Sequence, residues 1–478
     1  MMKTQFYRLF LSITILQLFL FSDLAKANNV QVSNVVRTGQ DIAFDLSWEN
    51  SWNVQGLPSN HDAVWVFIKY KKCTEAIWNH ALLNTNMTSH SFGSAITYAT
   101  PILETDRFGN GTGNNTGVMI KRSDIGIGHI NANNSISLNI VGPVAFDSDD
   151  YDIRVFAVEM VYIVEGEFIA GNLNSRDLKE TGQDYLHIVN EDPINITDNT
   201  YTLTLPAEFP KGYNAFYIMK YEITQGQYVD FLNTLTAGDA NRYYETSNYM
   251  HGFMSNTGTD GIVYTTTSAD RALNYLTLDD VFSYLDWAAL RPLSELEYEK
   301  ACRGFGPYNE DEYAWGSNTG IKVFNVSGAT AGIEVATDDP LPNCNINYDP
   351  INGGQFNGDK GPVAVGMFAR TSNTRIGTGA SFFGVMELSG NIEEHCLAVQ
   401  DANANDSPSS YTGQWGDGYI NSSGLFNVND WSGHYFIAKG GGWHDSWSYM
   451  RVSYRGSLYA MSSYHASRYD DRGGRGCR

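Results

Sequence analysis

Alternating apolar and polar positions recur through the first third of the chain. Residues 41–48 and 63–70 alternate in this way and are rich in β-branched and aromatic side chains, and residues 135–141 and 151–158 repeat the pattern. A period of two places every second side chain on one face, as in a β-strand. Several short strands separated by turn-forming stretches are typical of a β-sandwich. We therefore predict an all-β, sandwich-like domain over residues 28–156.

Signals for helices begin only after about residue 157. Three segments fit the capping box, in which a hydroxyl and a second polar side chain three residues later satisfy backbone N–H groups at a helix start. They are Thr224 with Gln227, Ser294 with Glu297 and, more weakly, Thr277 with Asp280. A few short helices among short strands and long loops predict an α+β domain over residues 157–478.

Composition narrows the class of partner. The chain has 31 Lys and Arg against 53 Asp and Glu, a net charge of −22, and 42% of its residues are hydrophobic. A surface of this sign repels nucleic-acid phosphates, so we expect no nucleic-acid partner. The hydrophobic content is sufficient for packed cores, and the acidity leaves room for divalent cations.

The N-terminus resembles a targeting segment. Lys3 and Arg8 precede an apolar run, and Ala25-Lys26-Ala27 follows it in the pattern that signal peptidases accept. The alternative is a membrane anchor, but the run is shorter than the ~20 residues needed to cross a bilayer. We predict a signal peptide at residues 1–27, cleaved near Ala27/Asn28. The mature protein is then secreted, periplasmic or at the cell surface, with no transmembrane anchor.

Carboxylates and arginines in the second half have two interpretations. Glu295, Glu297 and Glu299 are candidates for acid–base pairs, but side chains at i and i+2 do not share a helix face. Arg455, Arg468 and Arg478 are candidates for an anion site or for ion pairs. The structural interpretation is favoured for both sets, because Glu297 already has a capping role and buried arginines are usually paired.

Seven short blocks between residues 157 and 478 follow an order that is typical of one family. They are residues 160–171, 216–231, 291–304, 313–316, 384–394, 439–443 and 476–478, among them Arg-Pro-Leu-Ser-Glu-Leu-Glu-Tyr-Glu and Lys-Gly-Gly-Gly-Trp. Together they resemble the formylglycine-generating enzyme, or sulfatase-modifying factor, family. The resemblance implies a C-type-lectin-like variant of the α+β fold.

The resemblance also implies calcium. The matching ligands are Glu387, the carbonyls of Gly390 and Ile392, and Glu394, and a second site would use the Asn345-Ile346 segment. Two carboxylates with loop carbonyls suit Ca²⁺, which takes six to eight oxygen ligands. The alternative is a solvated acidic turn.

One departure from the family concerns its catalytic metal. In the catalytic relatives two cysteines bind copper(I), and Asp445 and Met450 stand at the matching positions here. A hard carboxylate and a thioether do not reproduce two soft thiolates, so copper and formylglycine generation are not expected.

Iron is the second redox metal that the resemblance brings into question. Some relatives bind non-heme iron through a His-x-x-x-His pair, which the sequence lacks. His444, Asp445 and His434 are candidates for a histidine–carboxylate iron site. The alternative is that His444 is an ordinary surface or hydrogen-bonded histidine.

Five cysteines leave at least one unpaired within the chain. They lie at positions 73, 302, 344, 396 and 477 and match no CxxC or zinc pattern, and the partners of Cys73, Cys344 and Cys396 stay open. The resemblance implies a disulfide between Cys302 and Cys477, although the second cysteine is offset by one position from the family's.

The functional hypothesis is an exported two-domain protein that binds or assembles with an extracellular or envelope protein or glycan. Aromatic residues of two long loops, 236–270 and 400–435, are candidates for ligand stacking. They are Tyr243, Tyr244, Tyr249, Trp415, Tyr419 and Trp431. They could equally pack the loops onto the core. A metal-dependent oxidoreductase with altered ligands is the alternative function, and a purely structural role in an envelope complex is the third.

Overall fold

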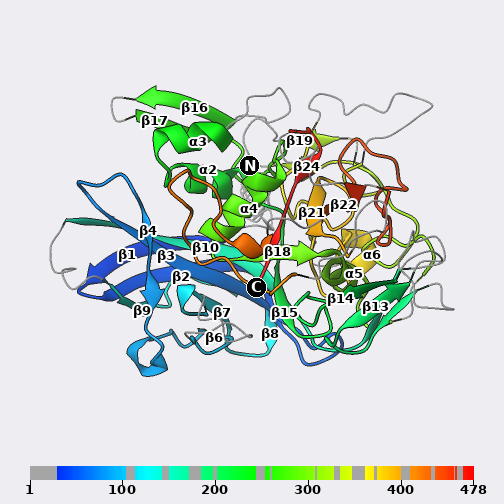
Figure 1. Cartoon of the computed structure of the whole chain (residues 1–478), viewed down its shortest axis with the longest axis horizontal. Coiled ribbons are helices and arrows are strands. Elements are labelled where there is room, and N and C mark those ends of the chain that lie inside the picture. The colour runs from blue at the N-terminus through cyan, green and yellow to red at the C-terminus, as the bar shows by residue number, and fades with distance from the viewer. Residues whose placement is uncertain are drawn as a thin grey trace, which may run out of the picture.

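Strands form most of the molecule, and a few short helices lie between them (Figure 1). The computed structural model describes residues 29–103, 114–142, 150–171, 185–197, 202–243, 253–258, 261–306, 309–323, 325–327, 334–346, 361–370, 374–399, 410–431, 436–456, 458–459 and 467–478. The predicted signal peptide lies outside these residues. Among the helices that the structure describes, none has both the length and the apolar character to cross a membrane.

A twelve-stranded sheet runs through the molecule. Its order is β23 (Leu458–Tyr459), β22 (Phe436–Lys439), β21 (Glu393–Leu397), β18 (Arg291–Ser294), β25 (Gly476–Cys477), β15 (Phe216–Met219), β10 (Tyr151–Ile163), β3 (Asp62–Lys72), β7 (Val118–Arg122) and β6 (Ile96–Tyr98), with β24 (Arg472–Gly473) on β21 and β4 (Asn79–His80) on β3. β21 pairs in parallel with β18 and β24, and the other pairs in this sheet are antiparallel.

Strand β10 joins the two predicted parts of the chain. It pairs with β3 from Tyr151 opposite Lys72 to Val161 opposite Asp62, and its last four residues pair with β15. The predicted boundary between residues 156 and 157 therefore falls inside a strand, and the N-terminal and C-terminal parts share one sheet.

The strands expected in the N-terminal part are all present. A second, five-stranded sheet contains β1 (Gln31–Thr38), β2 (Asp41–Asn53), β5 (Leu82–Leu83), β8 (Gly126–Ile130) and β9 (Ile136–Val141). Phe44 and Leu138 of this sheet share an apolar cluster with Val64, Val66 and Ile120 of the large sheet. Burial of this cluster holds the two sheets together.

Strand β3 is buried on both faces. Its alternate residues Val64 and Val66 face the five-stranded sheet, whereas Trp65 and Phe67 join a second cluster with Trp287 and other helical residues. In Figure 1 helices α2 (Gln225–Leu232), α3 (Ala237–Tyr243) and α4 (Leu278–Trp287) lie above β3 and β10. The alternation in the sequence therefore separates two cores rather than a core from solvent.

All three expected capping boxes are confirmed. α2, α4 and α5 (Glu295–Arg303) begin after Thr224, Thr277 and Ser294, and both reciprocal hydrogen bonds of the motif are formed at each. Helix α6 (Arg375–Thr378) and the 3₁₀ turns η1 (Met87–Ser89), η2 (Asn114–Thr116) and η4 (Asn429–Trp431) complete the described helical elements. These starts are local, because the partners lie three residues apart.

The expectation of a long loop over residues 236–270 is wrong. This stretch contains α3 and the hairpin of β16 (Phe253–Gly258) with β17 (Gly261–Thr266). The remaining small pairs are β11 (Phe168–Ala170) with β12 (Leu186–Ile188), β13 (Ile194–Thr197) with β14 (Thr202–Leu205), and β19 (Val326–Ser327) with β20 (Val335–Ala336).

Candidate functional site

Three buried glutamates and one arginine meet at the predicted calcium-binding turn. Glu387 lies in the turn before β21, Glu394 on β21, Glu222 after β15, and Arg475 between β24 and β25. Arg475 Nη2 lies 2.7 Å from Glu394 Oε1. Both Glu387 and Glu394 are close enough to Arg475 for its charge to lower their pKa values. Segments distant in sequence thus assemble one charged cluster.

Two of the three glutamates, Glu222 and Glu387, shape the turn through hydrogen bonds. Glu222 accepts hydrogen bonds from the Asn391 side chain at 2.8 Å and from the backbone N–H of Ile392 at 3.2 Å. Glu387 Oε1 accepts from the backbone N–H of Gly366 at 3.0 Å. These bonds hold the backbone that carries the predicted carbonyl ligands.

Several side-chain oxygens of the described residues in this cluster accept no hydrogen bond. Among the described residues, Glu387 Oε2, Glu394 Oε2 and Asn345 Oδ1 are buried without a hydrogen-bond partner. Asn345 is beside the same turn, since its carbonyl accepts from the backbone N–H of Asn391 at 2.9 Å. Buried oxygens without donors are costly, and a bound cation is one way to satisfy them.

The cluster also carries a net negative charge when all of its groups are ionised. Three carboxylates and one guanidinium sum to −2 when all are ionised. Burial raises the pKa of Glu387 to about 7 and raises the pKa values of Glu222 and Glu394. The cluster therefore needs protons or a divalent cation, and the residues present fit Ca²⁺.

The sequence prediction found part of this cluster. Asn345 lies beside the turn that carries Gly390 and Ile392, and Glu387 and Glu394 both lie near Arg475. The Ile346 side chain is fully buried in an apolar cluster with Trp315, Cys344 and Met450. Calcium binding by these residues stays a prediction. Glu222 and Arg475 were missed, although both lie in or beside family-like blocks; their contact depends on the fold.

A second cluster lies after β22. His444, Asp445 and Asp471 each offer a ligand atom, and these atoms lie within 4.8 Å of one another. His444 Nε2 is 3.3 Å from Asp471 Oδ2, and His444 Nδ1 is 3.8 Å from Asp470 Oδ1. The structure thus pairs His444 with Asp445, adds Asp471, which sequence reasoning missed, and leaves His434 outside the described residues.

The protonated form of His444 is favoured, and it pairs with Asp471. A hydrogen bond with Asp471 raises the pKa of His444 to about 9, against the opposing effect of burial. A protonated imidazole donates hydrogen bonds and does not ligate a metal. Metal binding at this cluster would therefore have to displace a proton from His444.

Asp445 and Met450, which the family resemblance matches to the copper-binding cysteines, lie in different surroundings. Asp445 Oδ2 accepts from the backbone N–H of Gly442 at 2.8 Å, and Met450 is fully buried in the apolar cluster with Trp315 and Ile346. Neither Asp445 nor Met450 supplies a thiolate.

The predicted disulfide is wrong. Cys302 on α5 and Cys477 on β25 are both free and buried in one apolar cluster. Cys477 is fixed by its pairing opposite Ile218 and Arg291, whereas Cys302 has Tyr298 as a hydrogen-bonding neighbour. Cys344 and Cys396 are also free and buried, and Cys73 is exposed. Burial raises the pKa of Cys302 and Cys477, which keeps both thiols protonated.

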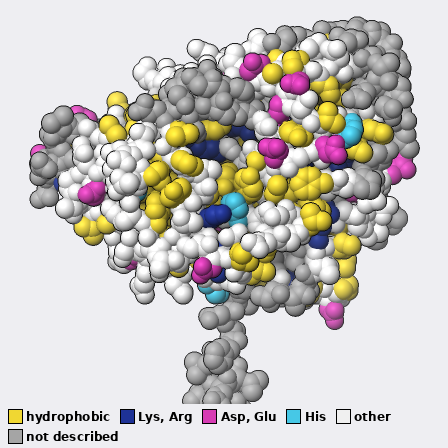
Figure 2. All heavy atoms as spheres, turned by 90° about the horizontal axis from the view of Figure 1, so that it is seen from below, with side chains coloured by type: hydrophobic (Ala, Val, Ile, Leu, Met, Phe, Trp, Pro, Cys, Tyr) yellow, Lys and Arg dark blue, Asp and Glu magenta, His cyan; other side chains and the backbone are white. Residues whose placement is uncertain are grey.

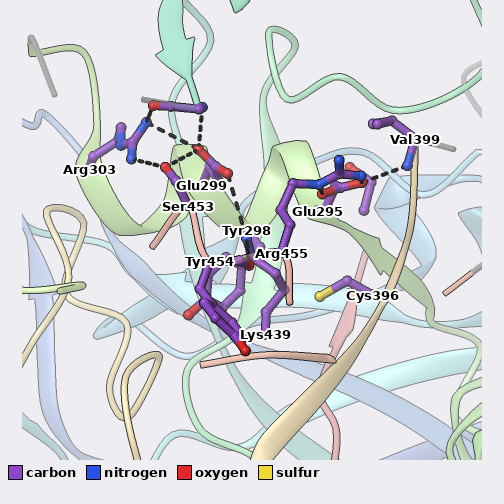
Figure 3. Close-up of polar contacts among 12 residues, drawn as sticks. Glu295, Tyr298, Glu299, Arg303, Cys396, Val399, Lys439, Ser453, Tyr454 and Arg455 are labelled. Carbon is purple, nitrogen blue, oxygen red and sulfur yellow. Dashed lines mark hydrogen bonds and ion pairs between the residues drawn. The ribbon is translucent and has the colours of Figure 1, made fainter. Parts of the chain in front are cut away.

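The glutamates at the start of α5 are structural, as expected. Figure 3 shows Glu295 facing Arg455, with Nε–Oε2 and Nη2–Oε1 distances of 2.8 and 2.9 Å, and both side chains are fully buried. Glu299 contacts both Arg303 and Ser453 in the same view, and its Oε2 is 3.1 Å from Arg303 Nη1. None of these carboxylates is placed for acid–base chemistry in an open site.

Glu297 and two of the three candidate arginines, Arg455 and Arg468, are also ion-pair partners. Glu297 forms two hydrogen bonds with Arg291, at 2.6 and 2.7 Å. Arg468 pairs with Asp280 of α4, as Arg455 does with Glu295. The third arginine, Arg478, lies 4.0 and 4.9 Å from the ring centroids of Trp65 and Trp415.

The stacking candidates divide into two groups. Tyr243 and Trp431 are buried in the core, where Tyr243 donates to Gly424 O and Trp431 Nε1 donates to Gln414 O at 3.0 Å. A ligand-stacking role for these two is therefore wrong. Trp415 is half-buried and Tyr419 is exposed, so both remain candidates. Tyr244 and Tyr249 lie outside the described residues.

Comparison with known proteins concerns mainly the C-terminal part. A search of curated proteins finds no match. Among solved structures, a backbone protein of the group B streptococcus pilus 2b matches with 12% identity, 50% coverage of this chain, 79% coverage of that chain and a TM-score of 0.11. So low a score carries no argument about fold. A family model described as "Sulfatase-modifying factor enzyme 1-like domain" matches residues 154–466. Because this match covers more than half of the chain, the chain belongs to the family of sulfatase-modifying factor enzyme 1-like domains.

Proposed function

We propose that the chain is exported and that its C-type-lectin-like, sulfatase-modifying factor domain is a calcium-containing module that binds an extracellular or envelope protein or glycan. It does not generate formylglycine. The observation that supports this most directly is the pair Asp445 and Met450 at the copper-ligand positions. Without two thiolates there is no soft site to hold copper(I).

Other features agree with a binding role. Four of the five cysteines are buried, and the one exposed cysteine, Cys73, lies on the turn after β3 in the N-terminal part. Glu297 and Glu295 are ion-pair partners of the buried Arg291 and Arg455. Trp415 and Tyr419 remain accessible on a long segment between β21 and β22. Such segments on a rigid scaffold commonly carry binding residues.

The test of the absent oxidation is an aldehyde assay. The purified chain is incubated with a cysteine-containing sulfatase-type peptide, copper(I) and dioxygen, and aldehyde is measured by mass spectrometry after hydrazide labelling. We expect no product above that of the peptide alone, whereas an active formylglycine-generating enzyme serves as positive control. Aldehyde formed in proportion to the chain would overturn the proposal.

A metal-dependent oxidoreductase is the second candidate, and the cluster of His444, Asp445 and Asp471 favours it. Elemental analysis after extensive dialysis separates the two functions. Under the binding proposal we expect calcium but no stoichiometric iron or copper. Stoichiometric iron that is lost in Asp471→Asn, a residue at the cluster, but kept in Asp152→Asn, an exposed aspartate of β10, would favour the oxidoreductase.

A further inference from the structure

A lysine and two carboxylates meet inside the sheet that the two parts of the chain share. Asp62 is the first residue of β3, Glu159 lies in β10, and Lys220 directly follows β15. Lys220 Nζ is 2.9 Å from Glu159 Oε2 and 3.3 Å from Asp62 Oδ2, and it donates a hydrogen bond to each. A lysine of the C-terminal part is thus in direct contact with a carboxylate of the N-terminal part.

The register of the strands places these three side chains on one face of the sheet. Asp62 is paired opposite Val161, which lies two residues after Glu159 on β10. Alternate residues of a strand share a face, so Asp62 and Glu159 are diagonal neighbours. The backbone N–H of Lys220 donates to Glu159 O at 2.9 Å, which makes these two residues neighbours across the next pair of strands. The contact is therefore fixed by the sheet itself.

Water is largely excluded from this contact. At most 3% of each of the three side chains is exposed. The rings of Trp52 and Tyr221 lie over the ammonium group, with centroids 4.9 and 5.4 Å from Lys220 Nζ. Figure 2 shows acidic side chains scattered over one face of the molecule, where water can solvate them. Asp62 and Glu159 lack this solvation, so their ionised forms are costly.

The buried charges favour the transfer of a proton within the cluster. Burial raises the pKa of Glu159 to about 7 and also raises the pKa of Asp62, against the opposing charge of Lys220. Burial, the largest single effect, lowers the pKa of Lys220, but Glu159, Tyr221 and Asp62 together leave it above its usual value. A free amine therefore forms here by transfer of a proton to Glu159, and low exposure favours the resulting neutral pair.

The carboxyl group of Asp62 is held for attack at its carbon. Its Oδ1 accepts hydrogen bonds from Ser51 Oγ and from the backbone N–H of Trp52, each at 2.9 Å. Its Oδ2 accepts from Trp48 Nε1 at 3.1 Å and faces Lys220. Two donors on one oxygen stabilise the negative charge that develops when a nucleophile adds to a carboxyl carbon. Oδ1 is therefore the oxygen to be retained, and Oδ2, beside the amine, is the oxygen to leave.

We propose that Lys220 and Asp62 condense to an isopeptide bond, with Glu159 moving the proton. Glu159 takes a proton from the ammonium group and returns it to Oδ2; the Nζ–Cγ bond forms and the Cγ–Oδ2 bond breaks. Of the three ammonium protons, one stays on the amide nitrogen and two leave with Oδ2 as water, so no oxidant or other reactant is consumed. The product replaces two buried charges with a neutral amide. It joins β3 covalently to the segment after β15, which goes beyond the proposed binding function.

The experiment is mass spectrometry of the full chain after its N-terminus has been determined. The reduced, denatured wild type should be lighter by one water than the mass calculated from its sequence. Trypsin does not cleave after an acylated lysine, so we expect residues 38–69 joined to residues 212–242 as one linked pair. Fragmentation of this pair should place the bond between Lys220 and Asp62.

Two substitutions test the roles of the residues. Lys220→Arg keeps the positive charge but cannot form the bond, so the calculated mass should be found and the linked pair should be absent. Glu159→Gln removes the proton acceptor and should lower the linked fraction roughly tenfold or more. Lys71→Arg is the matched control, because Lys71 also lies 3.3 Å from an aspartate, Asp152, but in a pair that water reaches. This variant should lose one water as the wild type does.

The wild-type result decides the inference whether or not the variants fold. The calculated mass without loss of water, or a water lost at another position, would overturn the bond. A linked pair that persists unchanged in Glu159→Gln would overturn the part assigned to Glu159. Thermal unfolding of each variant checks that a missing bond does not simply report a chain that has failed to fold.

Discussion

Replacing Glu295 with alanine is expected to lower the free energy of unfolding by about 3–5 kcal/mol. The change removes both oxygens that pair with Arg455 and the acceptor for the backbone N–H of Val399. A buried guanidinium then loses its compensating charge, which costs far more than the loss of an exposed pair. Urea unfolding followed by tryptophan fluorescence measures the difference.

The matched control is Glu75→Ala. Glu75 pairs with Lys72 at 3.7 Å, and about half of each side chain is exposed. Its removal should change stability by no more than about 1 kcal/mol. A loss at Glu295 as small as that at Glu75 would contradict the structural role of the buried pair.

The Glu295 pair also predicts an acid dependence. Burial, the largest single effect, raises the pKa of Glu295, but Arg455, Lys439 and the hydrogen bond from the Val399 N–H together leave this pKa below its usual value. Its contribution is therefore fully present above the pKa of the unfolded chain and is lost as pH falls through the folded value. The difference in stability between the wild type and Glu295→Gln should shrink accordingly on acidification.

Calcium should stabilise the protein, because the cluster of Glu222, Glu387, Glu394 and Arg475 has a charge of −2 when ionised and oxygens without donors. At a free concentration one hundred times its dissociation constant, one bound ion adds about 2.7 kcal/mol. Glu387→Gln should remove most of this gain, and Glu75→Gln, at an exposed site, should leave it intact. Thermal unfolding with calcium or with a chelator measures the effect.

The same cluster predicts a pH dependence of the calcium-free protein. The pKa of Glu387 is raised from 4.5 to about 7, so between these values the folded chain holds a proton that the unfolded chain has lost. Its contribution to stability therefore falls as pH rises through this window and is constant above it. Calcium binds the ionised form, so its stabilising effect should grow over the same window. Equal unfolding temperatures with calcium and with chelator at pH 8 would contradict a calcium site.

Local features of the fold could be predicted from the sequence. Thr224, Thr277 and Ser294 start helices as expected, because a capping box needs only residues three positions apart. The alternating segments are strands, because alternation directly reflects which side chains share a face. The order of the short blocks identified the family for the same reason: each block is contiguous.

Contacts between distant segments could not be predicted. Asp471 meets His444, and Arg475 meets Glu394, only because β24 and β25 return beside β21 and β15. Sequence spacing carries no information about such neighbours. The same holds for burial of Tyr243, which depends on contacts with Ser283 and Gly424.

The sequence by itself determined the family, the strands and the helix starts. The tertiary structure alone decided which charges meet, which aromatic rings stay accessible, and that Cys302 and Cys477 are free. The physical reason is the separation along the chain over which each interaction acts. Hydrogen bonds of a turn and the period of a strand act over a few residues, whereas charge pairing and packing act between any surfaces that the chain brings together.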